Sequence, residues 1–137
     1  MNTAYLDTLP AIADTKGLQL DMGEKHVFTA PLSMFGTETD QFLGGTGSVL
    51  YLTNRSIAAH NTVGLFSANI ATDVASYETV TKGSFVFKTS YTQVNLSTIL
   101  AYGTDGATLR GFHFYFKRKG DQRSFEDILA NVLPRAR

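Results

Sequence analysis

The stretch from residue 109 to 117, LRGFHFYFK, restricts the fold of this chain more than any other part of its sequence. Phe112, Phe114 and Phe116 alternate with other residue types, and a period of two is the pattern of a β-strand. One face of the strand therefore carries three phenylalanine rings, and burying each contributes about 1.5–3 kcal/mol. A second element has to cover this face.

An amphipathic helix near the end of the sequence is predicted to supply that cover. Ser124 is the expected N-cap, Glu126 and Asp127 place negative charge in the first turn, and Pro134 ends the helix. The apolar positions recur at helical spacing and form one stripe: Phe125, Ile128, Leu129, Val132 and Leu133. We expect this helix to lie over a sheet or to plug the opening of a barrel.

A hairpin is predicted from residue 47 to 61, GSVLYLTNRSIAAHN. Two short apolar strands flank the sequence Thr53-Asn54-Arg55, and asparagine suits a tight turn because it tolerates positive φ. Both faces of the first strand are apolar or aromatic, so we expect the hairpin to lie within a packed sheet.

A strand is predicted before the hairpin, over residues 26–35. Pro31 donates no ladder hydrogen bond, so we expect an edge position, a bend or a bulge there. Residues 36–46 are predicted to form a loop, which contains acidic residues and neither Lys nor Arg.

Residues 62–83 form an insert between the hairpin and the later strands. The spacing of Ile70, Val74 and Tyr77 predicts a helix over 68–78 with Ser67 as its N-cap, although the Thr and Val residues there also suit a strand.

After the insert, the pattern predicts an extended segment that starts at 85–87 and continues to Leu96. A separate short strand is expected over 99–102, followed by a turn at 103–106, where Gly and Asp residues cluster. Residues 1–23 are expected to form an arm or a short helix that begins near Pro10, because proline is tolerated at the first helical position.

The 137 residues fit a single domain, residues 1–137, in which 43% of the residues are hydrophobic. The absence of cysteine excludes disulfides, thiolate catalysis and cysteine-held metal centres. The sequence has no apolar run of about 20 residues, the length that a membrane-spanning helix requires. Its first residues lack the basic start of a secretory signal, so we expect a cytoplasmic location.

Three segments resemble the pleckstrin-homology-like (PH-like) superfold, in particular GRAM and bacterial PH-like domains. The hairpin GSVLYLTNRSIAAHN is similar to the GRAM pattern G-x-L-Y-L-T-N-x-R-L, and VNLSTILAY (94–102) stands in the place of its I-x-x-I strand. GFHFYFK and the helix FEDILANVL complete a resemblance that covers about residues 24–133. The insert at 62–83 and the N-terminal arm depart from the family pattern.

The resemblance implies a mainly β (α+β) fold, a bent antiparallel β-barrel of about seven strands capped by the C-terminal helix. Such domains bind phosphoinositides, bind proteins or assemble as homo-oligomers, and are rarely enzymes by themselves. Phosphoinositide-binding members carry Lys and Arg in the loop after the first strand. Here that loop has Glu38 and Asp40 and no basic residue, which argues against binding of a specific headgroup.

Lys117, Arg118, Lys119 and Arg123 form the basic cluster of the sequence. They are candidates for binding an anionic membrane surface, a phosphate or an acidic partner, and each basic residue near lipid headgroups contributes about 1 kcal/mol. The competing interpretation is a solvated strand end and helix start, and Asp121 nearby weakens the positive field.

Other chemistries find less support in the sequence. His26, His60 and His113 stand apart from one another and from carboxylates at metal-site spacing, so we predict no metal, cofactor or catalytic residue. Gly44–Gly47 lacks the Gly-Lys-Ser/Thr ending of a phosphate-binding loop. The near-neutral composition argues against nucleic acid, and no small-molecule substrate is evident.

The predicted function is therefore that of a non-enzymatic binding module which acts through protein contacts or homo-oligomer assembly. The alternative is peripheral association with anionic lipids through the 117–123 basic patch.

Overall fold

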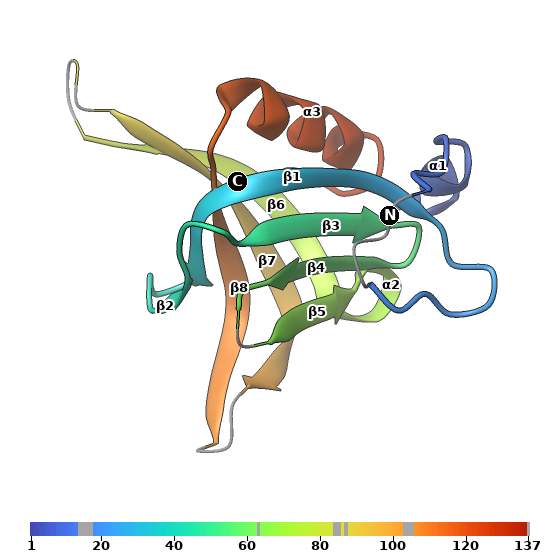
Figure 1. Ribbon diagram of the computed structural model, residues 1–137, viewed down its shortest axis with the longest axis horizontal. Coiled ribbons are helices and arrows are strands. Elements are labelled where there is room, and N and C mark those ends of the chain that lie inside the picture. The colour runs from blue at the N-terminus through green and yellow to red at the C-terminus, as the bar shows by residue number, and fades with distance from the viewer. Residues whose placement is uncertain (14–17, 63, 84–85, 87, 103–105, 137) are drawn as a thin grey trace.

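Eight strands form one antiparallel sheet with three short helices around it, in a computed structural model that describes residues 1–13, 18–62, 64–83, 86, 88–102 and 106–136 (Figure 1). The strands are β1 (His26–Thr37), β2 (Phe42–Gly44), β3 (Val49–Thr53), β4 (Ser56–His60), β5 (Leu65–Asn69), β6 (Val74–Lys82), β7 (Thr89–Tyr102) and β8 (Ala107–Phe116). The helices are α1 (Ala4–Asp7), α2 (Ile70–Asp73) and α3 (Lys119–Ala130). The predicted mainly β class is confirmed.

The sheet is not closed. Its strands follow the order β5-β4-β3-β1-β8-β7-β6, and β2 pairs with β1 off this path. The two end strands, β5 and β6, are joined by the four residues of α2. In Figure 1, β3, β4 and β5 cross the front of the molecule, while β6, β7 and β8 run steeply behind them. The sheet thus folds back on itself and encloses the core.

β1 changes its main partner near Pro31. Pro31 is the last residue paired with β3, opposite Val49, and Leu32 is the first residue paired with β8, opposite Phe116. The register of the second pairing shifts between Leu32 and Met34. The bulge therefore lies just after Pro31 and not at it, and β1 is a central strand and not the edge strand that was one of the expectations. A residue without an amide hydrogen suits the point where the ladder passes from one neighbour to the other.

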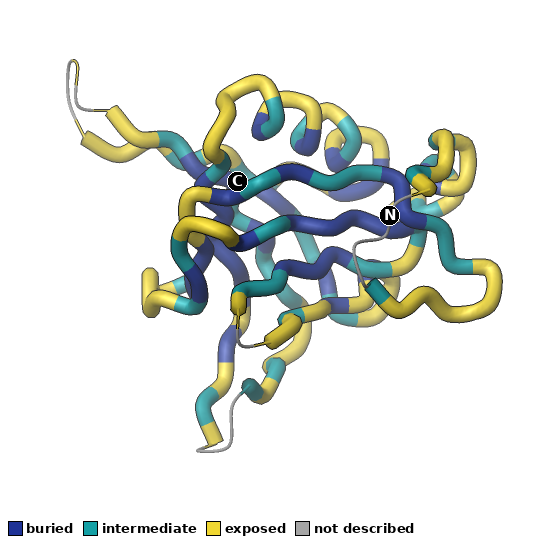
Figure 2. The backbone as a smooth tube through the Cα atoms, viewed as in Figure 1, coloured by how far each residue is buried: buried dark blue, intermediate teal, exposed yellow. Residues whose placement is uncertain are grey.

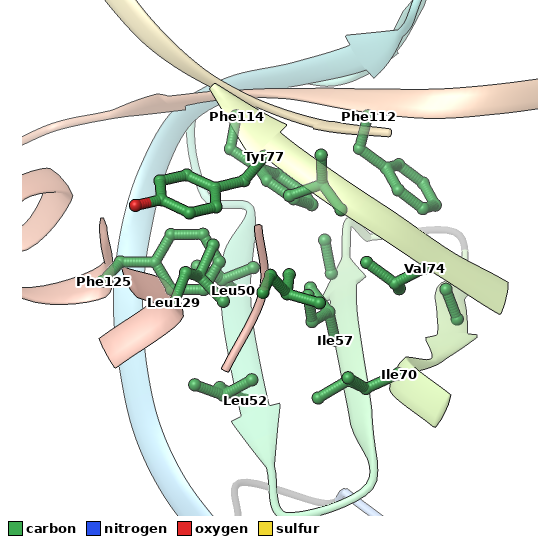
Figure 3. Close-up of a cluster of buried hydrophobic side chains, with 14 of the residues drawn as sticks. Leu50, Leu52, Ile57, Ile70, Val74, Tyr77, Phe112, Phe114, Phe125 and Leu129 are labelled. Carbon is green, nitrogen blue, oxygen red and sulfur yellow. The ribbon is translucent and has the colours of Figure 1, made fainter. Parts of the chain in front are cut away.

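The core lies between the two layers and under α3. Phe112 and Phe114 are buried, and Phe116 packs against the core with partial exposure. The ring of Phe125, from α3, lies 6.3 Å from the ring of Phe114 and 5.6 Å from that of Phe116. Figure 3 shows Phe125 and Leu129 facing the side chains of β3 and β4, and Figure 2 shows α3 buried only along its inner face. The predicted packing of the three-phenylalanine strand under the last helix is confirmed.

The predicted hairpin is present as β3 and β4, but its turn is built differently from the expectation. Asn54 does not have positive φ; among the described non-glycine residues, Asp40 does. The hydroxyl of Thr53 instead accepts hydrogen bonds from the backbone N–H groups of Arg55 (3.1 Å) and Ser56 (2.9 Å). The Asn54 side chain accepts from the N–H of Lys25 at 2.8 Å and so ties the turn to the N-terminal segment.

The helix predicted over 68–78 is wrong. Only Ile70–Asp73 is helical, capped by the side chain of Asn69 and not by Ser67, and the following residues form β6. β6 pairs with β7 from Val74 to Lys82. The β-branched residues of this segment fit a sheet, and pairing with a long neighbour outweighs the weak helical spacing.

Three further element boundaries differ from the prediction. α1 ends at Asp7, and the described residues 10–13, where a helix was expected to begin, are not helical. α3 begins at Lys119, which places Ser124 inside the helix and not at its N-cap. The separate strand expected at 99–102 is the end of β7, which continues past an irregularity between Asn95 and Leu100.

The predicted loop 36–46 contains the end of β1 and all of β2. The start of the next extended segment was predicted at 85–87, and residues 85 and 87 lie outside the described part of the chain. Residues 103–105 of the turn predicted at 103–106 also lie outside it. Within the described residues, no helix is long and apolar enough to cross a bilayer.

Candidate functional site

The predicted basic cluster lies where β8 passes into α3. Lys117, Arg118, Lys119 and Arg123 are all exposed, as the sequence led us to expect. Lys88, from the connection between β6 and β7, lines an open groove of about 660 Å³ together with Lys117 and Lys119, whereas Arg118 and Arg123 do not line it. We call this the basic groove. Hydroxyl groups complete its lining: Thr79, Thr81, Thr89 and Ser90.

The charges at this junction oppose the ordinary electrostatics of a helix start. Cations at the N-terminus of a helix face the positive end of its dipole. Arg118 occupies the N-cap position without a side-chain cap, Lys119 is the first helical residue, and Asp121 is the acidic residue of the first turn. A bound anion would relieve this repulsion.

The neighbouring carboxylate of Glu126 does not neutralise the cluster by a direct ion pair. It accepts hydrogen bonds from the hydroxyls of Thr79 (2.5 Å) and Thr92, and from the amide of Gln122 at 3.4 Å. Within the described residues, no ion pair involves the basic cluster. The cations of the groove therefore remain available to an external anion.

A second polar group, which the sequence did not reveal, lies on the outer face of β8. His113, expected to be isolated, is 3% exposed, and its Nδ1 lies 2.7 Å from Oδ1 of Asp40. Its Nε2 lies 3.0 Å from Oε1 of Gln93. The hydroxyl of Tyr115 donates to Asp40 at 3.3 Å, and Lys82 pairs with the other oxygen of Asp40.

The surroundings of these side chains shift the pKa values of Asp40 and of two tyrosines. Hydrogen bonds from Lys82 and then from His113 lower the pKa of Asp40 from 3.8 to about 2. Burial raises the pKa of Tyr91 and of Tyr115. Asp40 is therefore a carboxylate at neutral pH and fixes the β1–β2 turn across β8.

This polar group has the character of a structural clasp, because its side chains are engaged with one another. Both ring nitrogens of His113 already have partners, and the ring stacks near Tyr91 with centroids 4.4 Å apart. In the described part of the chain, no three His, Asp or Glu side chains are arranged to hold a metal ion.

A third feature lies between β5 and the ends of β7 and β8, on the other side of the molecule from the predicted cluster. We call it the β5 cleft. It has a volume of about 610 Å³ and is lined mainly by apolar side chains: Leu65, Phe66, Leu100, Tyr102, Leu109 and Phe112. Leu65 is 54% exposed at its rim, and the rings of Phe66 and Tyr102 meet across it at 6.0 Å.

The edge of β5 beside this cleft carries no further strand among the described residues. The only signal for it in the sequence was indirect, an apolar pair, Leu65 and Phe66, in a segment that had no assigned role. The cleft itself was not predictable, because its two walls are separated by more than thirty residues, from Phe66 to Leu100.

Comparisons of this chain with models of protein families, with curated protein sequences and with solved structures find no match. Its function has to be inferred from the geometry of the fold and of these three features.

Proposed function

We propose that this chain is a non-catalytic binding module of the PH/GRAM-like class. The order of its elements supports the assignment. β1, β3, β4 and β5 form one run of neighbouring strands, β8, β7 and β6 form the other, and α3 follows the last strand. The YLTN segment forms the hairpin of β3 and β4, and this supports the assignment. The sheet path, bent around a core that α3 covers, supports a partly open barrel.

The module acts through contact with a partner protein at the β5 cleft. The observation that carries this proposal is the combination of a sheet edge to which no described strand pairs with an apolar cleft at its side. An exposed edge strand presents backbone groups that pair readily with another chain. Concave sites with apolar walls and few polar groups are the usual shape of binding sites.

Site-specific photo-crosslinking in the native host tests this function. A benzophenone amino acid at Leu65, on the rim of the cleft, should give a discrete protein adduct. The matched control places it at Asp127, on the exposed side of α3. Adducts of equal yield and pattern at both positions, or none at Leu65, would contradict the proposal.

Association with an anionic surface is the second candidate function, favoured by the basic groove and its unpaired cations. Each of its basic residues would contribute about 1 kcal/mol near anionic headgroups. Glu38 and Asp40 are still the acidic residues of the β1–β2 turn, which favours general charge attraction over recognition of one headgroup.

Co-sedimentation with phosphatidylserine vesicles at low salt tests the second function. The full chain should bind, and a variant with Lys88, Lys117, Lys119 and Arg123 changed to Gln should lose most of this binding. Arg110→Gln removes one exposed charge outside the groove and should bind as the unchanged chain does. Absence of binding at low salt, or binding that high salt leaves intact, would rule out this electrostatic mechanism.

A further inference from the structure

We propose that the β5 cleft binds an extended peptide segment of the partner protein, which adds to the sheet as a strand beside β5. This inference rests on the proposed protein-binding function and specifies the chemistry of the partner. Two observations carry it: the direction of the backbone groups of β5 and the shape of the cleft.

The hydrogen-bond pattern of the β4–β5 ladder shows which backbone groups face outward. Ile70 N–H bonds to Arg55 O at 2.8 Å, and Asn61 N–H bonds to Gly64 O at 3.1 Å. Because bonded pairs alternate along an antiparallel ladder, the even-numbered residues of β5 bond to β4. The N–H and C=O groups of Leu65 and Ser67 therefore point away from β4, toward the space that a further strand would occupy.

Asn69, the next odd-numbered residue of β5, does not offer its N–H group to a ligand. The N–H of Asn69 bonds to the carboxylate of Asp73 at 2.9 Å, within the α2 corner. The open stretch is thus short and defined, with two residues that each offer one donor and one acceptor. An extended peptide is the ligand whose own backbone matches that spacing.

The cleft supplies a place for a side chain of that peptide. Alternate side chains of an added strand point to the inner side of the sheet. On that side, Phe66, Leu109 and Phe112 form an apolar wall. The ligand we infer is therefore a segment with an apolar residue flanked by residues whose side chains face solvent.

The surroundings of the cleft favour a single strand over the sheet of a second copy. In Figure 1, the ends of β7 and β8 reach past the edge of β5. They would cover one face of an added strand. Two copies joined through β5 would each bring such an extension into the same space, because a twofold contact repeats every feature.

A display library of random linear nonapeptides is the probe for this inference. Selected peptides should share one apolar position, and fluorescence polarisation then measures their binding to variants. Ser67→Pro removes the outward N–H and should weaken binding by about tenfold or more, since a hydrogen bond and its geometry are lost. Asp127→Ala, on the exposed side of α3, should bind as the unchanged chain does. Circular dichroism checks that both variants are folded.

Hydrogen exchange of the unchanged chain gives a second readout that does not depend on variants. Bound peptide should slow exchange of the amides of Leu65 and Ser67 at least tenfold, while the amides of Phe66 and Ala68 are already protected by β4. Binding without protection of Leu65 and Ser67, equal binding to Ser67→Pro, failure to select any peptide, or occupation of the edge by a second copy in solution would overturn strand addition. The crosslink at Leu65 would survive such an outcome and would leave the protein-binding function standing.

Discussion

Asp40 connects more elements than its place in a short turn suggests. Its φ of 63° lies in the left-handed region, and its carboxylate contacts His113, Tyr115 and Lys82. These partners belong to β8 and to the end of β6. One side chain therefore holds the β1–β2 turn against the outer face of the sheet.

Replacing Asp40 by Asn should lower the free energy of unfolding at pH 7 by about 1 kcal/mol, a value kept small because the side chain is 38% exposed. Asparagine tolerates the same φ, so the change removes mainly the charge. The pKa of Asp40 is about 2 when folded and 3.8 otherwise. The carboxylate therefore stabilises the fold above pH 3.8, and this contribution disappears as the pH falls through 2.

Urea unfolding of both chains at pH 7, 4 and 3 measures this effect. The difference between them should be largest at pH 7 and should shrink between pH 4 and 3. A difference that stays constant over this range would show that the charge of Asp40 is not what stabilises the clasp.

Gly111 is the second residue with a specific steric role. A Cβ at this position would lie 2.9 Å from the carbonyl oxygen of Val94 and 3.3 Å from Cβ of Glu38. The first of these atoms belongs to the backbone of β7 and cannot move without shifting the sheet. Gly111→Ala should therefore lower stability by about 1–3 kcal/mol, as overpacking does.

Thermal unfolding compares Gly111→Ala with Gly64→Ala, where an added Cβ meets no atom within 4 Å. Gly64→Ala should unfold close to the unchanged chain. If the two variants lose the same stability, the close approach of β7 and the β1–β2 turn at Gly111 is not the cause.

At the scale of residues, the exposure of side chains was predictable from their near neighbours in the sequence, but contacts between residues far apart in the sequence were not. The exposure of Lys117, Arg118 and Lys119 follows from their place after a strand. The pairing of His113 with Asp40 joins residues 73 positions apart, and no periodicity reports such a contact. The same holds for Gly111, whose neighbours come from β7 and from the β1–β2 turn.

At the scale of elements, α3 shows which features of a helix a sequence encodes. Its apolar stripe, with Phe125 and Leu129 buried, was predictable because side-chain spacing fixes the buried face. Its start was not, because Ser124 has the chemistry of a cap but lies within the helix. The chain becomes helical directly after Arg118, whose backbone is still extended.

Gly120→Ala should stabilise the chain by up to about 1 kcal/mol, because glycine is a poor helix former. Gly120 lies in the first turn of α3, and an added Cβ meets nothing within 4 Å. Urea unfolding at pH 7 measures the change. A loss of stability would instead indicate that this turn is not helical in solution.

At the scale of the molecule, the sequence predicted the class and the last two elements better than the middle of the sheet. The segment 62–83, interpreted as an insert, supplies β5, α2 and β6, the two ends of the sheet and the corner between them. Edge strands have one neighbour and a mixed pattern of burial, so their sequences carry a weak periodic signal.

The last residues of the chain cover part of the second sheet end. Tyr77 N–H donates to Pro134 O at 3.2 Å, and Ala136 N–H donates to Tyr77 O at 2.8 Å. Removing residues 134–137 should expose this edge of β6 and increase self-association, because unpaired edges recruit other chains. Light scattering over a range of protein concentrations measures the change.

Arg135→Ala is the control for that truncation. It removes the guanidinium that lies 5.3 Å from the centre of the Tyr77 ring but keeps both backbone hydrogen bonds. This variant should self-associate no more than the full chain does. If the truncated chain also shows no increase in self-association, residues 134–137 do not protect the edge of β6.

The change of partner at Pro31 has a consequence for biosynthesis. The first half of β1 can pair with β3 once β3 has left the ribosome, but the second half has to wait for β8, the last strand to be synthesised. Closure of such distant contacts is slow. A nascent chain thus leaves Leu32 and Phe35 without their β8 partners, Phe116 and Phe114, through most of translation, which is when a chaperone could bind them.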